Sequence, residues 1–564
     1  MGVILQASYR KSANPTISVP APTDGKGDPW WYDRLAMQMA SYRGLFTNIQ
    51  LPPCHKTIGG ASPSSDGYGV YWEYDLGSKE QPTRFGYLDI LRRMCAIAFA
   101  NGILPMADWV PHQRYGGNNG VYEYQASGGS AKGRFPKQPG CFRGSTQADY
   151  AEGRVPEDPV PDRPDDFAFG DELCPVNGRP AGYVQNELIK AGQWLYRTLD
   201  LRGCRNDDTK GQAIRAVNAL SSAAPMRSNP CIGEYADGSK DALAWWLSQV
   251  RSNNYAYDFE VKYRLRDMCN NGSRWDMSQL PGVGLASKGP LWAMRAVPFV
   301  ENADSDTNGF GAVVYNKLLA YAYVLTAEGW PSVYYRDYAE EADCYGLKPG
   351  IDNLLWIHER LANGGTAWRH AEYQFVVYER EGFPGLLVGL NNDIWGGWKT
   401  VRVQTSFGPN TRLHDYSGHS GDAWTDGGGA VTIGIPPNDN GRGYVCYSRD
   451  GAGGSIETPS HTTTQMFAGS GDLLTPPAAP EGAPAGRIWC AEGSHIHINK
   501  PGSEPVRFAV TDSSGAAIID RGWDGTVKRR GWHDIAAYAI LSTPWEAYFT
   551  YKATTDLHRS ECDS

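Results

Sequence analysis

Residues 199–211, LDLRGCRNDDTKG, decide how the rest of the chain is interpreted. A short apolar run leads to an arginine two residues before an aspartate, and a lysine follows three residues later. Alternate side chains of a strand share a face, so Arg205 and Asp207 are expected to point the same way where the strand ends. Two interpretations are open here: a carboxylate held ionised by a guanidinium to act as a nucleophile, or a structural ion pair.

The composition limits the class of protein. A chain of 564 residues is expected to form two to four domains. The formal charge of −9 argues against a nucleic-acid partner, which requires a basic face. No apolar run approaches the roughly 18 residues of a membrane span. The 19 tryptophans and 32 tyrosines suit flat, hydroxyl-rich ligands such as sugars, although most aromatic side chains lie in cores.

The eleven cysteines are scattered, with no CxxC and no histidine at zinc spacing, which argues against a metal-thiolate site. An odd number leaves at least one unpaired. Cys141 and Cys174 flank a loop-rich region, and we expect this pair to form a disulfide. The first residues, MGVILQASY, are typical of a strand and not of a signal peptide, so a leader was either removed or never present.

Strand-like and helix-like segments alternate over the first 365 residues. Helices are predicted at residues 31–43, 87–100 and 184–199. This rhythm favours a (β/α)8 barrel in the α/β class over a doubly wound open sheet, because no GxGxxG follows an early strand. Residues 113–182, rich in Gly, Pro and Asp, form a long insertion after the third strand. The eight strand-like segments are 3–6, 46–51, 103–110, 203–207, 231–234, 255–261, 296–302 and 331–335.

The pattern changes to period two after the barrel. Residues 366–452 are predicted to form an all-β sandwich, and residues 453–487 a linker rich in Gly, Pro and Ala. Residues 488–564 form an additional β domain of unknown role. Its tryptophans could bind polysaccharide, although each more commonly belongs to a core. They are Trp489, Trp523, Trp532 and Trp545.

The barrel places chemistry at the carboxyl ends of its strands. Three carboxylates on three separate strand ends, Asp207, Glu234 and Asp304, exceed what a solvated surface usually offers. The barrel would bring them to one face. The polar residues at these positions are Tyr68, Asp108, His112, Arg205, Asp207, Lys210, Glu234 and Asp304.

Four short segments carry a resemblance to a known family. DWVPH (108–112), GCRND (203–207), GEY (233–235) and NAD (302–304) occur in the order of the four motifs of the α-amylase family, glycoside hydrolase family 13. The chain resembles this family over about residues 3–450, and the sandwich resembles its usual C-terminal domain. Each motif alone is short, but together they are specific.

The resemblance implies a catalytic set. Retaining hydrolysis needs an ionised carboxylate that attacks the anomeric carbon and a carboxylic acid about 5–5.5 Å away that protonates the leaving oxygen. Asp207, kept ionised by Arg205, would be the nucleophile. Glu234 would be the acid and later the base, with a pKa raised by burial and carboxylate neighbours. Asp304 would stabilise the oxocarbenium-like transition state.

The resemblance also implies substrate contacts, with a structural role as the alternative for each residue. Tyr68 would stack on the reacting sugar and His112 would hydrogen-bond its hydroxyl. Lys210 would contact the sugar on the far side of the scissile bond. Arg205 and Asn302 complete the predicted substrate-binding set.

The chain also departs from the family pattern. Ala303 stands where the family has a histidine that binds the reacting sugar, and such a lost hydrogen bond typically costs a few kcal/mol. Pro111 stands where the family has an asparagine that commonly ligates a structural calcium, and proline offers no side-chain oxygen. Gly211 replaces a histidine of many relatives. Calcium therefore stays open as a cofactor, and its candidate ligands in the insertion are Asp165, Asp166 and Asp171.

The resemblance implies a retaining hydrolase that cleaves α-1,4-glycosidic bonds of starch, glycogen or maltooligosaccharides through a covalent glycosyl-enzyme intermediate. Two alternatives stay open: an α-glucan transglycosylase using the same site, and a weakly active barrel kept for carbohydrate binding. We expect a monomeric, extracellular or secreted protein whose leader is absent from this chain. Its partner would be a polysaccharide or oligosaccharide, with no nucleic acid, membrane or organic cofactor.

Overall fold

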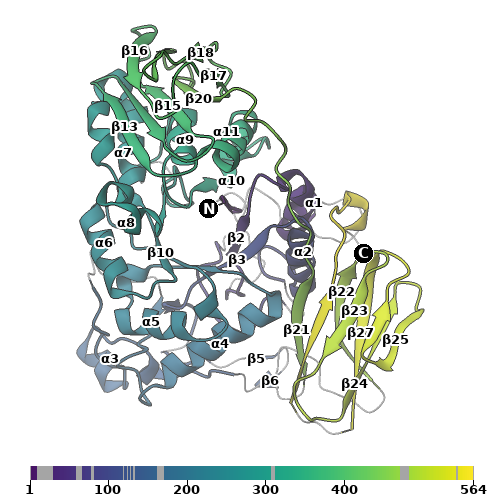
Figure 1. Cartoon of the computed structure of the whole chain (residues 1–564). Helices are drawn as coiled ribbons and strands as arrows, with labels where there is room; N and C mark the ends of the chain where they lie inside the picture. The colour runs from purple at the N-terminus through teal and green to yellow at the C-terminus, as the bar shows by residue number, and fades with distance from the viewer. Residues whose placement is uncertain are drawn as a thin grey trace. The chain divides into compact units, whose positions relative to one another are not determined.

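A sheet of eight short strands is the central element of the computed structural model (Figure 1). Its order is β11-β10-β9-β8-β3-β2-β1-β12, and Phe299, just beyond β11, pairs in parallel with Ser332 of β12, which joins the two ends of the sheet. The predicted (β/α)8 barrel is therefore confirmed. The strands are β1 (Ile4–Gln6), β2 (Asn48–Pro53), β3 (Leu104–Trp109), β8 (Cys204–Asn206), β9 (Cys231–Gly233), β10 (Asn254–Tyr257), β11 (Ala296–Val297) and β12 (Ser332–Tyr334).

The structure describes residues 2–8, 29–58, 66–77, 82–117, 120–122, 125–126, 129–130, 134–161, 170–306, 311–469, 482–540 and 544–562. The described chain divides into two compact units. The first contains Met1–Tyr9, Gly44–Asn48 and Tyr235–Glu457, and the second contains Arg10–Arg43, Ile49–Glu234 and Thr458–Ser564.

Helices follow most of the barrel strands, as predicted. The strand predicted at 255–261 ends at Tyr257, because the Asp258 carboxylate accepts the backbone N–H of Val261 (3.2 Å) and begins a helix there. The longer helices are α1 (Trp31–Tyr42), α2 (Leu88–Ala100), α4 (Tyr183–Leu199), α5 (Ile214–Ser222), α6 (Lys240–Gln249), α7 (Phe259–Asn271), α9 (Lys317–Thr326) and α11 (Lys348–Leu361). Short helices are α3 (Gln147–Ala151), α8 (Pro290–Ala293) and α10 (Tyr335–Tyr338).

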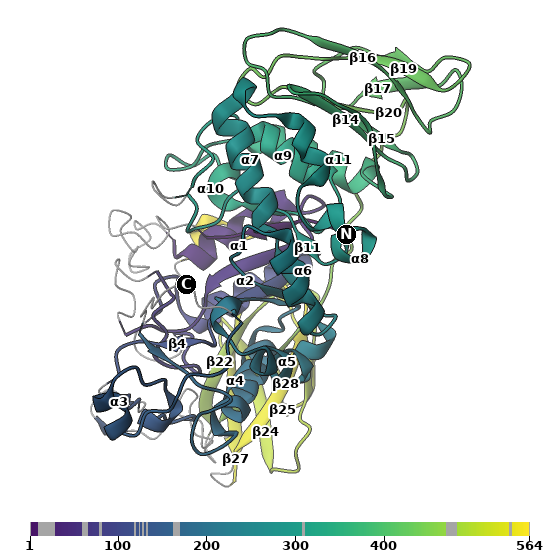
Figure 2. The same ribbon diagram turned by 90° about the vertical axis from the view of Figure 1, so that its left-hand side faces the viewer.

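The first unit ends in the predicted antiparallel sandwich. One sheet has the order β13-β14-β15-β20-β17-β18, and β16 pairs with β19 at the upper edge of Figure 2. Inward side chains such as Val377, Leu387 and Ile433 form one buried core. The strands are β13 (Thr366–Ala371), β14 (Phe375–Arg380), β15 (Leu386–Asn391), β16 (Lys399–Gln404), β17 (Arg412–Asp415), β18 (Ala423–Trp424), β19 (Ala430–Ile435) and β20 (Tyr444–Arg449).

In the second unit, the insertion after β3 is anchored by a buried charge cluster. The two oxygens of Glu73 bind Arg114 Nε (2.6 Å) and Lys137 Nζ (2.8 Å). Burial disfavours the Glu73 carboxylate, but Lys137 and Arg114 outweigh it and lower its pKa to about 2. The insertion contains two pairs of short strands, β4 (Gln113–Arg114) with β7 (Asp171–Glu172) and β5 (Gln125–Ala126) with β6 (Gly129–Ser130).

Two segments of the predicted linker 453–487 are strands of the last β domain, so this part of the prediction is wrong. Period-two alternation is weak in both segments, and their partner strands lie later in the chain. The domain has two four-stranded sheets, ordered β21-β28-β23-β26 and β22-β27-β24-β25. Its strands are β21 (Thr463–Gly469), β22 (Ala483–Cys490), β23 (His495–Asn499), β24 (Val506–Asp512), β25 (Ala517–Gly522), β26 (Asp524–Thr526), β27 (Gly531–Ala539) and β28 (Trp545–Tyr551).

This last domain packs on α2 within the second unit. Arg92 donates to the carbonyl of Met466 (2.8 Å), and the Arg93 guanidinium lies 4.7 Å and 4.6 Å from the ring centroids of Trp489 and Trp532. Both tryptophans and Trp545 are buried. They therefore belong to the core and not to an exposed polysaccharide-binding surface, which was the other interpretation. Trp523 is half-buried, with Arg507 beside its ring.

The predicted disulfide between Cys141 and Cys174 is wrong. Both thiols are free, although the Cys174 N–H donates to the Cys141 carbonyl (2.9 Å). Their sulfurs contact different carbonyls, those of Arg179 and Pro156. Sequence separation could not show which way the two side chains point. Among the described helices, none combines the length and apolar character needed to cross a bilayer.

Candidate active site

Three neighbouring strands of the second unit align the predicted acids. In the parallel register, Asp108 of β3 pairs with Arg205 of β8. Backbone hydrogen bonds continue past the strand ends, from Asp207 N to Trp109 O (3.0 Å) and from Glu234 N to Asn206 O (3.0 Å). The extended pairing therefore brings Asp108, Asp207 and Glu234 to the same edge of the sheet.

Arg205 is the centre of this cluster. Its guanidinium binds Asp108 Oδ1 (2.7 Å), Asp207 Oδ1 (2.6 Å) and Glu234 Oε2 (2.5 Å). Asp207 and Glu234 contact different nitrogens of the same planar group, so one guanidinium bridges the two carboxylates. The sequence-based expectation that Arg205 and Asp207 share a face is confirmed.

The electrostatics of the cluster differ from the expectation for Asp207. Burial raises the pKa of Asp207 to about 7, and the opposing effect of Arg205 is insufficient because Asp108 and Asp208 add negative charge. Burial likewise raises the pKa of Asp108. Burial disfavours the Arg205 cation, but Asp108 and Glu234 outweigh this effect and raise its pKa. One guanidinium does not fully compensate three acids in a desolvated site.

Tyr68 and Gln113 complete the contacts around the acids. The Tyr68 hydroxyl donates to Asp108 Oδ2 (2.9 Å), and its half-buried ring lies 5.4 Å from the Arg205 guanidinium carbon. Gln113 Nε2 donates to Asp207 Oδ2 (3.3 Å), and its oxygen lies 3.2 Å from His112 Nδ1. Sequence reasoning missed Gln113, although it directly follows His112 in DWVPHQ. His112 is thus placed one contact away from Asp207.

A tight turn after β8 positions Lys210. Asp208 adopts the left-handed region (φ 38°), and its side chain accepts the N–H of Gly211 (3.3 Å). The Thr209 N–H donates to the Glu234 carbonyl (3.0 Å), which ties the turn to the end of β9. Lys210 is buried within this turn, three residues after Asp207.

Asp304 and Asn302 follow β11 in the first unit. Asn302 Oδ1 accepts the N–H of Ser305 (2.8 Å), so its side chain closes a local turn. Asp304 is exposed in that turn, and Ala303 is half-buried. The neighbouring acid Glu301 is buried against Lys317 (3.3 Å). Because Asp304 and Asp207 belong to different units, their convergence stays a prediction.

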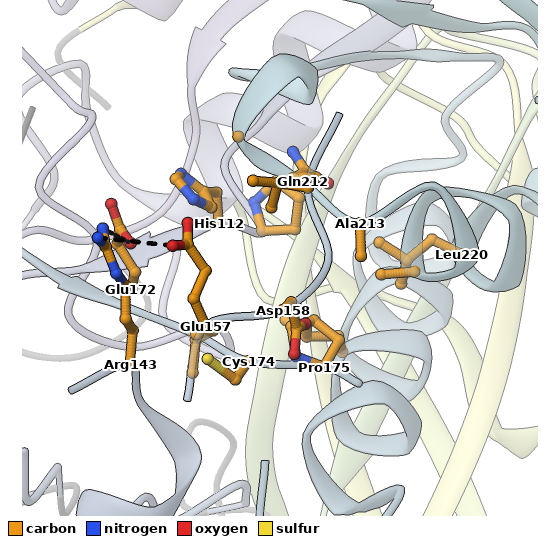
Figure 3. A pocket seen from close by; sticks show the side chains of 16 residues that line it. His112, Arg143, Glu157, Asp158, Glu172, Cys174, Pro175, Gln212, Ala213 and Leu220 are labelled. Carbon is orange, nitrogen blue, oxygen red and sulfur yellow. Dashed lines mark hydrogen bonds and ion pairs between the residues drawn. The ribbon is translucent and has the colours of Figure 1, made fainter. Parts of the chain in front are cut away.

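The described residues around Pro111 do not fit a calcium ion. Figure 3 shows the pocket that Pro111, His112 and Gly211 help to line, with the Arg143 guanidinium beside Glu172 (3.1 Å) and Glu157 (3.6 Å). The cation in this pocket is therefore supplied by an arginine. Asp158, on the same wall, uses both oxygens to accept backbone N–H groups from residues 176 (2.9 Å) and 177 (2.6 Å).

Asp171, the remaining described candidate ligand, is also committed to protein donors. Its oxygens bind Arg154 Nη2 (2.8 Å) and the Tyr122 hydroxyl (2.7 Å). Asp165 and Asp166 lie outside the described residues. Within the described residues, no group of three or more His, Cys, Asp or Glu side chains could hold a metal ion. Calcium binding stays a prediction that these donors do not support.

Comparisons with known proteins bear on the fold and on the family that the chain resembles. Residues 386–448 match a family described as α-amylase C-terminal. The α-amylase of Bacillus licheniformis is 27% identical over 276 residues, covering 44% of this chain and 53% of that protein, so the chain spans about half of that relative. The α-amylase of Geobacillus stearothermophilus is 27% identical over 487 residues, covering 75% of this chain and 83% of that protein.

A solved structure supports the fold independently. An α-amylase from Malbranchea cinnamomea superposes with a TM-score of 0.58 and 17% identity, covering 81% of this chain and 98% of that chain. At this identity the likeness concerns architecture alone. The two sequence relatives and the structural neighbour are all α-amylases.

Proposed function

Because this chain belongs to the α-amylase family of glycoside hydrolases, we propose that it cleaves α-1,4-glycosidic bonds of starch, glycogen or maltooligosaccharides with retention of anomeric configuration. The observation that carries this proposal is the sharing of one guanidinium by Asp207 and Glu234. Retaining enzymes hold their two carboxyl groups about 5–5.5 Å apart, whereas inverting enzymes need about 6.5–9.5 Å to admit a water. A shared guanidinium supports the shorter separation.

In the proposed mechanism, Asp207 attacks the anomeric carbon while Glu234 protonates the leaving oxygen. The bond from the anomeric carbon to that oxygen breaks as the bond to Asp207 forms. Glu234, now a carboxylate, then takes a proton from water, and the hydroxide displaces Asp207. The positive charge that develops on the sugar ring is attracted by the negative charge of the carboxylates around it.

Arg205 has a positioning role in this scheme. Its contacts to Asp108, Asp207 and Glu234 fix the acids before substrate arrives, so little reorganisation is needed during the reaction. Tyr68 would present its half-buried ring to the sugar, with its hydroxyl held by Asp108. Gln113 would orient the second oxygen of Asp207.

The experiment is reducing-sugar release from soluble starch, with the anomeric form of the first product followed by NMR. Wild type is expected to release the α-anomer, and Asp207→Asn and Glu234→Gln are expected to lose at least about 10²–10⁴-fold in kcat. Asp241→Asn, at an exposed carboxylate paired with Lys288, is the matched control and should retain activity. A β-anomeric product, or activity that survives Asp207→Asn, would contradict the proposal.

The transglycosylase alternative differs only in whether water or an acceptor hydroxyl displaces Asp207. Chromatography of products from maltooligosaccharides, with and without added glucose as acceptor, separates the two outcomes. Longer products that increase with acceptor indicate transfer. Secretion and the monomeric state stay predictions.

A further inference from the structure

A loop in the C-terminal sandwich exposes two tryptophans. Trp395 is 86% exposed and Trp398 is 56% exposed, both between β15 and β16. Indole rings usually lie largely buried, and an exposed cluster of large apolar side chains commonly marks a binding surface. These two rings are separated by only Gly396 and Gly397, so they stand within a few residues' length of each other.

The loop is fixed by one buried carboxylate. Asp393 Oδ1 accepts the N–H groups of Trp395 (3.0 Å) and Gly396 (2.9 Å) and the hydroxyl of Ser273 (2.9 Å). Its other oxygen binds Lys399 Nζ (2.8 Å). An exposed indole on an anchored turn is held ready for a ligand, which reduces the entropy lost on binding.

The sandwich itself supports the second indole. Trp398 lies over Gly434 of β19, where an added Cβ would come within 3.2 Å of the ring. A glycine at this strand position leaves room for the indole to lie against the sheet. The pair β16 and β19 that carries this contact is visible at the upper edge of Figure 2.

A third aromatic side chain belongs to the same end of the sandwich. Tyr373 is 53% exposed, and its hydroxyl donates to the Arg274 carbonyl (2.9 Å), which fixes the ring. The next residue, Gln374, accepts the N–H of Asn392 (3.0 Å) and binds Lys399 (2.7 Å), so the turn before β14 is tied to the tryptophan loop. We call Tyr373, Trp395 and Trp398 the aromatic platform.

The charge around the platform selects the kind of ligand. Lys399 is neutralised by Asp393, and Gln374 adds a neutral amide. Nucleic acids and anionic membranes are attracted by unpaired basic clusters, whereas these groups form a balanced pair. Aromatic faces with a neighbouring amide match the apolar faces and hydroxyl edges of a neutral sugar chain.

We propose that the aromatic platform is a second, non-catalytic binding site for α-glucan chains. The inference rests on the proposed function, because that function supplies the polymer. Such a site would hold an insoluble or long glucan on the enzyme without taking part in bond cleavage. Short soluble substrates would not need it.

The test measures binding to insoluble starch granules by sedimentation in a Glu234→Gln background, which removes turnover. Adding Trp395→Ala and Trp398→Ala is expected to weaken granule binding by at least about tenfold, because both exposed stacking faces are lost. The same two substitutions in the active enzyme should leave kcat/KM on maltoheptaose unchanged. Far-UV circular dichroism and Tm establish that the double variant is folded.

Trp424→Ala is the matched control, since this indole is 59% exposed on the same sandwich but lies beside Arg412. It should bind granules as the parent does. Granule binding that survives the double substitution overturns the platform while the proposed function stands. If the double substitution abolishes granule binding but the enzyme without substitutions does not cleave maltoheptaose, the platform stands and the proposed function is refuted. A dimer that the double substitution dissociates would assign the platform to a second copy and overturn it.

Discussion

At the scale of the residue, the chemistry depends on one cation, Arg205, that contacts three acids. These acids are Asp108, Asp207 and Glu234. Asp207 is buried beside Asp108, and its pKa is raised to about 7 despite the contact with Arg205. An aspartate must be ionised to attack, so the fraction of competent enzyme falls as the pH drops through this pKa.

We expect kcat/KM on maltoheptaose to decline below about pH 7, tenfold per pH unit, well above the ordinary pKa of an aspartic acid near 4. Asp108→Asn removes a charge that raises the pKa of Asp207, so the acid limb should move to lower pH. Gln113→Ala removes a hydrogen bond that lowers the pKa of Asp207, so the acid limb of the pH profile should move to higher pH. An acid limb near pH 4 in all three proteins would contradict this.

The sequence predicted the positions of these residues better than their electrostatics. Strand alternation correctly placed Arg205 and Asp207 on one face, because alternation depends only on local geometry. It could not predict that Asp207 is desolvated, since burial is created by residues far away in the chain. Gln113 was missed for the same reason, as its partner Asp207 is 94 positions distant.

At the scale of the element, the cluster of Glu73, Arg114 and Lys137 fastens the insertion to the loop before α2. Helix and strand boundaries were predicted within a few residues where periodicity was strong, as for α2 and α4. The strands β21 and β22 were missed because long-range pairing, and not local pattern, stabilises them. The local sequence of one strand does not show which distant strand it pairs with.

Glu73→Gln should lower the free energy of unfolding by about 3–5 kcal/mol at pH 7, because two buried cations lose their counter-charge. The pKa of Glu73 is lowered in the folded protein to about 2, so its contribution is full above about pH 5 and is lost as the pH falls toward 2. The difference between the two proteins in urea unfolding should therefore shrink in acid. Glu187→Gln, at a surface pair with Lys190, is the control and should change stability by less than about 1 kcal/mol.

At the scale of the whole molecule, ion pairs occupy the place where the family resemblance led us to consider calcium. We expect EDTA treatment followed by dialysis to leave Tm unchanged, because Arg143 already balances Glu157 and Glu172. Thermal unfolding followed by circular dichroism, together with metal analysis of the dialysed protein, measures this. A fall in Tm that added Ca²⁺ reverses would refute the prediction.

The last β domain is an integral part of the second unit. Deleting residues 458–564 would uncover α2, including the buried Arg92 and Arg93. It would also remove one of the two acceptors of the Asn101 side chain, the Thr555 carbonyl (2.7 Å). We expect the shortened protein to be largely insoluble, with a lower Tm in any soluble fraction. A soluble truncation with the parent Tm would show that the domain is an independent attachment.

The discontinuous make-up of the second unit affects synthesis. Its segment Ile49–Glu234 emerges from the ribosome long before Thr458–Ser564, while the intervening residues belong to the other unit. At about 5–20 residues per second, helix α2 stays without the last β domain that covers it for roughly 20–90 s. During that interval its apolar side would be a target for chaperones, and expression hosts poor in them should yield more aggregate.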